Sequence, residues 1–253
     1  MVFLHGWSQS ASAWRSIVRS LSGRYRCVVM DLRGHGRSAA PDDGYAMEHL
    51  VSDLTGLLDH LSLQRPTVIG WSLGAMVAVA AFPALREKLS SLVLVAGTPK
   101  FSSTTDYPAA LSPKEPRVLG LRLKRDPERT WQEFFRGMFT TEERSSCNFE
   151  IMEEEFLAEA PRPSRHGAAR SLETLATADL RGVLDAVDVP VLLVHGSGDP
   201  ICPVGASRFM AERIPGAVLH ELDGAGHAPM LSRAVALSSI LDKFLKGVYE
   251  GDR

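Results

Sequence analysis

The chain has 253 residues, of which 45% are hydrophobic and 23% are charged, and its formal net charge at pH 7 is −2. This length suits either one large α/β domain or a core domain that carries an insertion, and the near-neutral charge gives no electrostatic case for nucleic-acid binding. No apolar run approaches the roughly 18 residues of a membrane span, and no basic-then-apolar leader is present. We therefore expect a cytoplasmic protein that makes no membrane contact.

The cysteines and histidines give no sign of a metal centre. Cys27, Cys147 and Cys202 lie far apart and form no CxxC pair, which argues against a disulfide framework or a zinc site and fits a reducing compartment. No histidine has a partner at metal-ligand spacing such as HxxxH. We expect neither a metal nor another cofactor.

The N-terminal part alternates predicted strands and helices. Apolar, β-branched runs predict strands at 1–4, 27–31 and 92–96, and another that begins at Thr67 and breaks at Gly70. Helical spacing predicts helices at 10–21 and 47–61, and a third after residue 72 that meets no strong turn signal before Pro83. Strands that alternate with helices of this length imply a parallel sheet covered on both faces.

This alternation stops at Gly97. From about residue 100 to 181 no apolar, β-branched run occurs, and helical patterns and prolines dominate. We interpret 100–181 as a helical cap inserted into a core formed by 1–99 and 182–253. The alternation resumes with strands at 189–195 and 218–222 and helices at 205–214 and about 231–245.

A serine lies where the third strand turns into its helix, in the motif Gly70-Trp71-Ser72-Leu73-Gly74. A serine on so sharp a turn has strained backbone angles, and Gly70 and Gly74 stand where a Cβ would collide with the opposite limb. The N-terminus of the following helix favours negative charge developing at Ser72. The motif predicts a nucleophile, although a glycine-containing strand end would explain the same five residues.

A serine hydroxyl needs a base, and the base needs an orienting carboxylate. His227 lies in a glycine-rich loop after the last strand, outside any strand or helix pattern, and is the predicted base. Asp199 follows the preceding strand and is the predicted acid. Its rivals are Asp223, which we interpret as a turn former, and Asp31, which precedes Ser72 and so breaks the serine–acid–histidine order of this fold.

Two backbone N–H groups are expected to bind the oxyanion. One belongs to the residue after the nucleophile and one to the loop after the early strand, which are Leu73 and Trp7 here. We interpret the His5 side chain as a packed imidazole in a tight turn.

The expected cap is strongly charge-patterned. Residues 113–136 include seven basic and four acidic residues, and residues 142–159 include seven acidic residues and one basic residue. These segments are either two solvated helix faces that pair with each other, or a docking surface for a charged partner.

Together the motifs resemble the α/β-hydrolase family over nearly the whole chain. The segments that carry this resemblance are His5-Gly6-Trp7, the glycine-rich loop 31–38, the motif 70–74, Gly198-Asp199 and Gly226-His227. More narrowly, 5–7, 70–74, 98–101, 129–134 and 225–229 are similar to the pimeloyl-[acyl-carrier protein] methyl ester esterases of biotin synthesis.

The resemblance implies an α/β-hydrolase fold, a mostly parallel sheet with helices on both faces and a helical cap insertion. It implies a serine carboxylesterase that acts on a carrier-bound pimeloyl methyl ester through an acyl-enzyme. It also implies roles for individual residues. The implied roles are a triad of Ser72, Asp199 and His227, a carbonyl site at Trp7 and Leu73, an acyl channel from Phe134 to Met138, and carrier-binding cations Arg129 and Arg144.

Three positions depart from this family. Glu133 stands where another arginine is expected, Ala75 replaces a common glycine, and the chain begins at the oxyanion-loop strand. The last departure implies either an unpaired sheet edge or a truncated start.

Other functions stay open. A related enzyme on small esters or lactones, such as a general carboxylesterase, enol-lactonase, carbon–carbon bond hydrolase or perhydrolase, would use the same three residues. A non-catalytic ligand-binding protein could share the fold. We expect a monomer.

Overall fold

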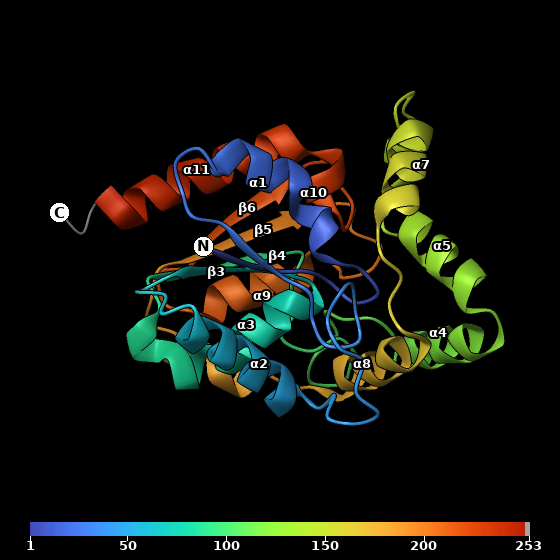
Figure 1. Cartoon of the computed structure of the whole chain (residues 1–253), viewed down its shortest axis with the longest axis horizontal. Coiled ribbons are helices and arrows are strands. Elements are labelled where there is room, and N and C mark those ends of the chain that lie inside the picture. The colour runs from blue at the N-terminus through green and yellow to red at the C-terminus, as the bar shows by residue number, and fades with distance from the viewer. Residues whose placement is uncertain (251–253) are drawn as a thin grey trace.

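A parallel six-stranded sheet forms the centre of the structure, a computed structural model that describes residues 1–250 (Figure 1). The spatial order is β2-β1-β3-β4-β5-β6, and each neighbouring pair runs parallel. The strands are β1 (Val2–Leu4), β2 (Val28–Met30), β3 (Thr67–Trp71), β4 (Ser91–Val95), β5 (Val191–Gly196) and β6 (Val218–Leu222). The central strands β3, β4 and β5 are buried along their whole length, as expected for apolar runs in a doubly covered sheet.

Helices cover both faces of this sheet (Figure 1). One face carries α1 (Arg15–Leu21), α10 (Pro229–Ser232) and α11 (Ala234–Glu250), and the other carries α2 (Met47–His60), α3 (Leu73–Leu85) and α9 (Gly205–Arg213). Short 3₁₀ turns lie at η1 (Ala11–Trp14), η2 (Arg86–Lys88) and η3 (Arg181–Ala186). Alternate strand residues enter opposite cores, so that Phe3 packs beside Trp14 while Leu4 packs on the α3 side.

Three helices differ from their predicted bounds. The helix expected at 10–21 consists of η1 followed by α1, and the last helix is split at Arg233 into α10 and α11. α3 continues through Pro83 to Leu85. Proline there removes one helical hydrogen bond near the helix end, and almost all other residues of α3 are buried. Packing therefore outweighs the local break signal.

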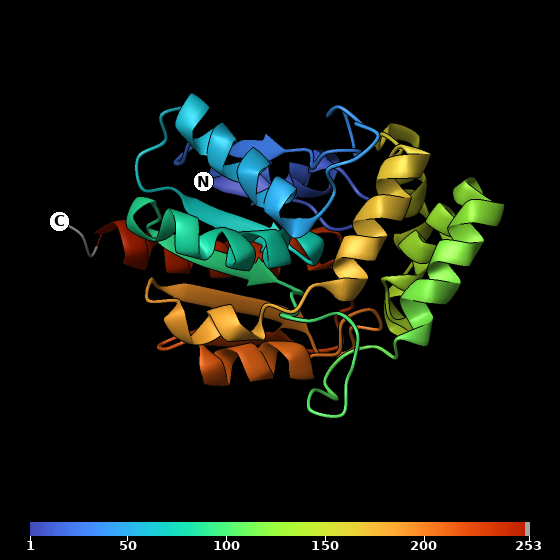
Figure 2. The same ribbon diagram turned by 90° about the horizontal axis from the view of Figure 1, so that it is seen from below.

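The expected cap follows β4 and precedes β5 in the sequence. In space it lies beyond the carboxyl ends of the strands (Figure 2). It consists of α4 (Lys114–Arg125), α5 (Pro127–Gly137), α6 (Thr141–Arg144), α7 (Phe149–Glu159) and α8 (Arg165–Thr177). The division of the chain at 99/100 and 181/182 stays a prediction. Over residues 1–250, the helices are too short or too polar to cross a bilayer.

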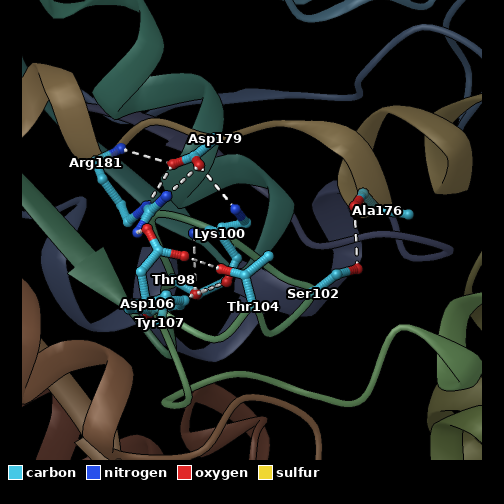
Figure 3. A network of polar contacts seen from close by, with 9 residues as sticks. All are labelled: Thr98, Lys100, Ser102, Thr104, Asp106, Tyr107, Ala176, Asp179 and Arg181. Carbon is cyan, nitrogen blue, oxygen red and sulfur yellow. Dashed lines mark hydrogen bonds and ion pairs between the residues drawn. The ribbon is translucent and has the colours of Figure 1, made fainter.

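A polar cluster joins the two chain segments that connect the cap to the core (Figure 3). We call Lys100, Asp106, Asp179 and Arg181 the hinge clamp. Lys100 Nζ lies 2.9 Å from Asp179, and Arg181 lies 2.7 Å from both Asp179 and Asp106. Hydrogen bonds from Arg181 and Lys100 hold the pKa of Asp179 well below its usual range. The Leu180 N–H donates to the Pro99 carbonyl at 2.8 Å, so the chain segments that enter and leave the cap are bonded to each other.

Candidate active site

Ser72 occupies a strained turn between β3 and α3. Its φ of 54° and ψ of −114° lie in a region that side chains other than glycine rarely adopt. A Cβ on Gly70 would lie 2.3 Å from the Gly74 carbonyl oxygen, which confirms the predicted collision with the opposite limb. A Cβ on Gly74 would instead lie 2.6 Å from the Leu4 carbonyl oxygen, so this glycine lets α3 approach the end of β1.

The two predicted oxyanion donors flank this serine. Leu73 is the first residue of α3, where backbone N–H groups have no partner within the helix. A Cβ on Gly6 would lie 3.2 Å from Ser72 Cβ, which places the backbone preceding Trp7 against the serine. The Trp7 indole N–H donates to the Ala168 carbonyl at 2.8 Å. The loop after β1 is thus held between the serine and the cap.

Two buried histidines, His5 and His35, fix this loop. His5 Nε2 accepts from the Leu32 N–H at 2.9 Å, and His35 Nε2 accepts from the Ser8 N–H at 3.2 Å. Their Nδ1 atoms lie 2.7 Å from the Gly6 carbonyl oxygen and 3.0 Å from that of Arg33. Each ring must therefore be neutral, with its proton on Nδ1. The packed imidazole expected at His5 is confirmed, whereas the matching role of the His35 side chain was not predicted.

These buried rings should make folding sensitive to acid. Burial, and then the neighbouring His5, lower the pKa of His35 to about 3, against ~6.5 in an unfolded chain. The unfolded state therefore binds more protons between these values, and stability present above pH 6.5 is lost as pH falls toward 3. Between pH 7 and pH 4.5 the free energy of unfolding should fall in both proteins. We expect the fall to be about 2 kcal/mol smaller in His35→Gln than in the wild type. Urea unfolding at both pH values measures this, and equal losses would contradict it.

Asp199 and His227 meet across the loops after β5 and β6. His227 Nδ1 donates to Asp199 Oδ2 at 2.7 Å, and both side chains are buried. Asp199 Oδ1 accepts from the backbone N–H groups of Ile201 at 2.8 Å and Cys202 at 2.9 Å. Burial alone would raise the pKa of Asp199, but His227 and His195 outweigh it and hold that pKa at about 2. The carboxylate therefore stays ionised and fixes the histidine proton on Nδ1.

The rival carboxylates have other partners. Asp31 accepts from the backbone N–H groups of Ala11 at 2.7 Å and Arg37 at 2.9 Å. Asp223 accepts from the Ser197 hydroxyl at 3.2 Å. Within residues 1–250, the carboxylate that pairs with His227 is that of Asp199.

His195 is a second histidine in contact with Asp199, and the sequence did not reveal this contact. Its Nε2 lies 3.0 Å from Asp199 Oδ2 and 2.7 Å from the Cys202 carbonyl oxygen, and its Nδ1 lies 2.6 Å from Ser207 Oγ. Ser207 is fully buried inside α9, away from any strand-to-helix turn. We therefore interpret the contacts of Ser207 and His195 as structural support that positions the Asp199 carboxylate.

The side chain of Trp71 joins the histidine loop to the serine turn. Its indole N–H donates to the His227 carbonyl at 2.8 Å, and the centres of the two rings lie 5.7 Å apart. Ser72, Asp199 and His227 are thus brought to the same edge of the sheet, under the cap. A serine hydroxyl, an imidazole and an ionised carboxylate so placed can perform acyl transfer.

The cap contributes Glu143, which the sequence analysis missed. This buried carboxylate accepts from the Thr140 N–H at 3.0 Å in a capping box, and the same Oε2 atom accepts from the Gly226 N–H at 3.0 Å. The adjacent His227 N–H donates to the Met138 carbonyl at 2.7 Å. The spacing of Thr140 and Glu143 is a recognisable capping signal, but no local pattern indicates Gly226 as the second partner.

Removing this carboxylate should loosen the histidine loop. We expect Glu143→Ala to lower kcat on a small ester by about tenfold to a hundredfold, because the buried N–H of Gly226 and the partly buried N–H of Thr140 lose their acceptor. Glu143→Gln keeps an oxygen at that place and should retain most of the activity. Steady-state kinetics with circular dichroism as a folding check compares them. An alanine variant within twofold of wild type would show that the loop holds itself.

The predicted cap residues lie in different surroundings. Phe134 is half-buried and packs edge-on against Trp7, with ring centres 4.8 Å apart. The Met138 side chain is buried among other apolar cap residues. The exposed Arg129 pairs with Glu133 at 2.7 Å, and Arg144 donates to the Phe139 carbonyl at 2.9 Å.

A cavity of about 470 Å³ lies between the cap and the loop of Asp199. Phe134, Pro200 and Ile201 form one part of its wall, and α4 forms another through Val118 and Arg122. Two wall residues neighbour the candidate site, because Phe134 contacts Trp7 and Pro200 follows Asp199, whereas Ser72, Asp199 and His227 do not line the cavity. Its size is that of a small-molecule pocket.

Comparison with known proteins gives concordant results. A family model described as the alpha/beta hydrolase fold matches residues 1–234. The chain is 35% identical over 235 residues to a pimeloyl-[acyl-carrier protein] methyl ester esterase from Nitrosomonas europaea, covering 92% of this chain and 90% of that protein. Among solved structures, it resembles an esterase from Exiguobacterium antarcticum with a TM-score of 0.89 and 27% identity, covering 97% of this chain and 91% of the other. A bromoperoxidase from Bacillus anthracis has a TM-score of 0.88, 26% identity and the same coverage.

Proposed function

We propose that this chain, a carboxylic ester hydrolase that belongs to the α/β-hydrolase family, hydrolyses the methyl ester of a pimeloyl group carried by an acyl carrier protein. The observation that carries this proposal is the 35% identity, over 92% of the chain, to an esterase named for that reaction. The buried Asp199–His227 pair beside the Ser72 turn supports the chemistry.

In this proposal Ser72 is the nucleophile. Its hydroxyl oxygen attacks the ester carbonyl carbon while His227 Nε2 takes the hydroxyl proton, and Asp199 stabilises the imidazolium that forms. The backbone N–H groups of Trp7 and Leu73 donate to the oxyanion. His227 then returns the proton to the departing methoxide. Methanol departs, and the acyl group remains bound to Ser72 as an acyl-enzyme. Water, activated by the same histidine, releases the free carboxylate and restores Ser72.

The cap would bind the rest of the substrate. The largely apolar cavity beside Phe134 suits a methylene chain. Met138, which the family resemblance also puts in the acyl channel, does not line this cavity. In the roles that the family implies, Arg129 and Arg144 would meet the acidic carrier. The Arg129–Glu133 pair and the Arg144–carbonyl contact compete with those roles.

The test uses the purified protein with a pimeloyl-carrier methyl ester. Mass spectrometry should show the loss of one methyl group from the carrier-bound acyl chain, and methanol should appear in equal amount. The gene should also rescue a biotin-requiring strain that lacks its own esterase. A protein that turns over p-nitrophenyl butyrate but leaves the carrier-bound ester intact would contradict the proposal.

A general carboxylesterase is the second candidate. It is favoured by the likeness to the Exiguobacterium antarcticum esterase and by the neutralisation of Arg129 by Glu133. The two candidates differ in the ratio of kcat/KM for the carrier-bound ester to kcat/KM for a small neutral ester. A ratio well above one supports the carrier-bound substrate.

A further inference from the structure

The outer face of α4 combines exposed apolar side chains with positive charge. Val118 and Leu121, one turn apart, are 43% and 60% exposed, whereas Pro116 and Leu123 on the opposite side are buried. We define the α4 face as Val118 and Leu121 together with the five cations of this helix. These cations are Lys114, Arg117, Arg122, Lys124 and Arg125. Two exposed aliphatic side chains within a cluster of cations suit contact with a partner that is both anionic and partly apolar.

The charge of this face is largely uncompensated. Among the five cations, the ion pair within residues 1–250 is that of Arg122 with Glu133, at 3.8 Å. The helix contains one carboxylate, Glu115. On the neighbouring α5, by contrast, Arg129 pairs with Glu133 and Arg136 pairs with Glu153, both at 2.7 Å. An approaching anion is therefore attracted more strongly by α4 than by α5.

The α4 face is continuous with the cavity beside the candidate active site. Val118 and Arg122 belong to both, and the cavity wall continues to Phe134 and Ile201. Phe134 in turn packs on Trp7, whose backbone N–H is a proposed oxyanion donor. A ligand held on the α4 face could therefore extend an arm through the cavity toward Ser72.

We infer that the α4 face is the docking surface for the acidic carrier protein, and that the carrier's acyl arm enters through this cavity. This inference rests on the proposed function, because it takes the substrate to be carrier-bound. Carrier proteins of this kind are acidic and present their acyl group on a flexible arm. The cations steer the carrier by long-range attraction, and Val118 and Leu121 supply apolar contact at the centre. Docking is thereby moved to α4 from Arg129 of α5 and Arg144 of α6, where the family resemblance puts it.

The test compares two double variants with the same change in net charge. Arg117→Glu with Arg125→Glu reverses the charge at two positions of the α4 face that lie outside the cavity. Lys243→Glu with Lys246→Glu changes exposed residues of α11, which lies on the far side of the molecule (Figure 1). At low salt the first variant should lower kcat/KM for the carrier-bound ester by at least about tenfold, whereas the second should leave it within twofold. Both should hydrolyse p-nitrophenyl butyrate at the wild-type rate, which also reports that they fold.

Each remaining outcome counts against the inference in a different way. If the wild type hydrolyses the carrier-bound ester and the α4 variant does so equally well, the docking surface is wrong while the proposed function stands. A larger loss from Arg129→Gln than from the α4 variant returns docking to α5. A dimer that sedimentation detects in the wild type and that the α4 variant loses assigns the face to a second copy of the chain. A wild type inactive on the carrier-bound ester overturns the proposed function and this inference together.

Discussion

Replacement of Ser72 by alanine is expected to lower kcat on every ester by roughly 10⁴-fold or more, because members of a serine–histidine–acid unit act together. The hydroxyl contributes little to folding, since Ser72 lies on a turn whose geometry is set by Gly70 and Gly74. Alanine at φ 54° carries the same strain as serine, so the thermal midpoint should change little. Kinetics with p-nitrophenyl butyrate and thermal unfolding measure both effects.

Ser207→Ala is the matched control for this experiment. Ser207 also contacts a histidine that touches Asp199, but it lies inside α9 with no exposed surface. We expect this variant to lose stability rather than most of its activity. If Ser72→Ala stays within tenfold of wild type while Ser207→Ala does not, the nucleophile has been misassigned.

Replacement of Asp199 by asparagine should cost on the order of 10⁴-fold in kcat by favouring the wrong histidine tautomer. The N–H groups of Ile201 and Cys202 both need an acceptor, so the amide oxygen of asparagine should take their side. Its NH₂ group then faces His227 Nδ1, which must become an acceptor and move its proton to Nε2. That nitrogen can no longer take the proton of Ser72.

Asp223→Asn provides the control on the other carboxylate of this region. Asp223 is exposed and bonds to Ser197, so its amide should leave kcat within about twofold of wild type. Proton NMR of the histidine rings in Asp199→Asn would show the tautomer directly. A greater loss of kcat in Asp223→Asn than in Asp199→Asn would identify Asp223 as the acid.

Local patterns were sufficient for the core of the fold. The strand at 218–222 has its predicted bounds, and the expected parallel sheet and helical insertion are confirmed. Apolar runs and glycine turns reflect burial and backbone geometry, which each segment encodes within itself. The split at Arg233 and the extension of α3 past Pro83 depend on packing against other segments, so no local signal indicates them.

The candidate site was predictable to the extent that its members follow strands. Ser72 comes directly after a strand, Asp199 and His227 lie in the loops after two others, and the carboxyl ends of parallel strands share one edge of the sheet. The supporting contacts were not predictable, because they join distant segments. His195 braces Asp199 from within β5, and Glu143 reaches Gly226 across 83 positions of sequence. Such pairs depend on tertiary distance, which the spacing of residues along the chain does not contain.

The hinge clamp and the contacts of the histidine loop divide the cap into parts that are fastened to the core and a part that is not. Lys100, Asp179 and Arg181 fasten its ends to each other, while Glu143 and Met138 fasten its middle to the histidine loop. A change at Glu143 or Met138 would reach the loop that carries His227. Within residues 1–250 the α4 face makes no contact of either kind, so a change there should spare turnover of a small ester and alter only the recognition of the carrier. A lineage could therefore exchange one macromolecular substrate for another by altering a single helix, while the catalytic residues keep their positions.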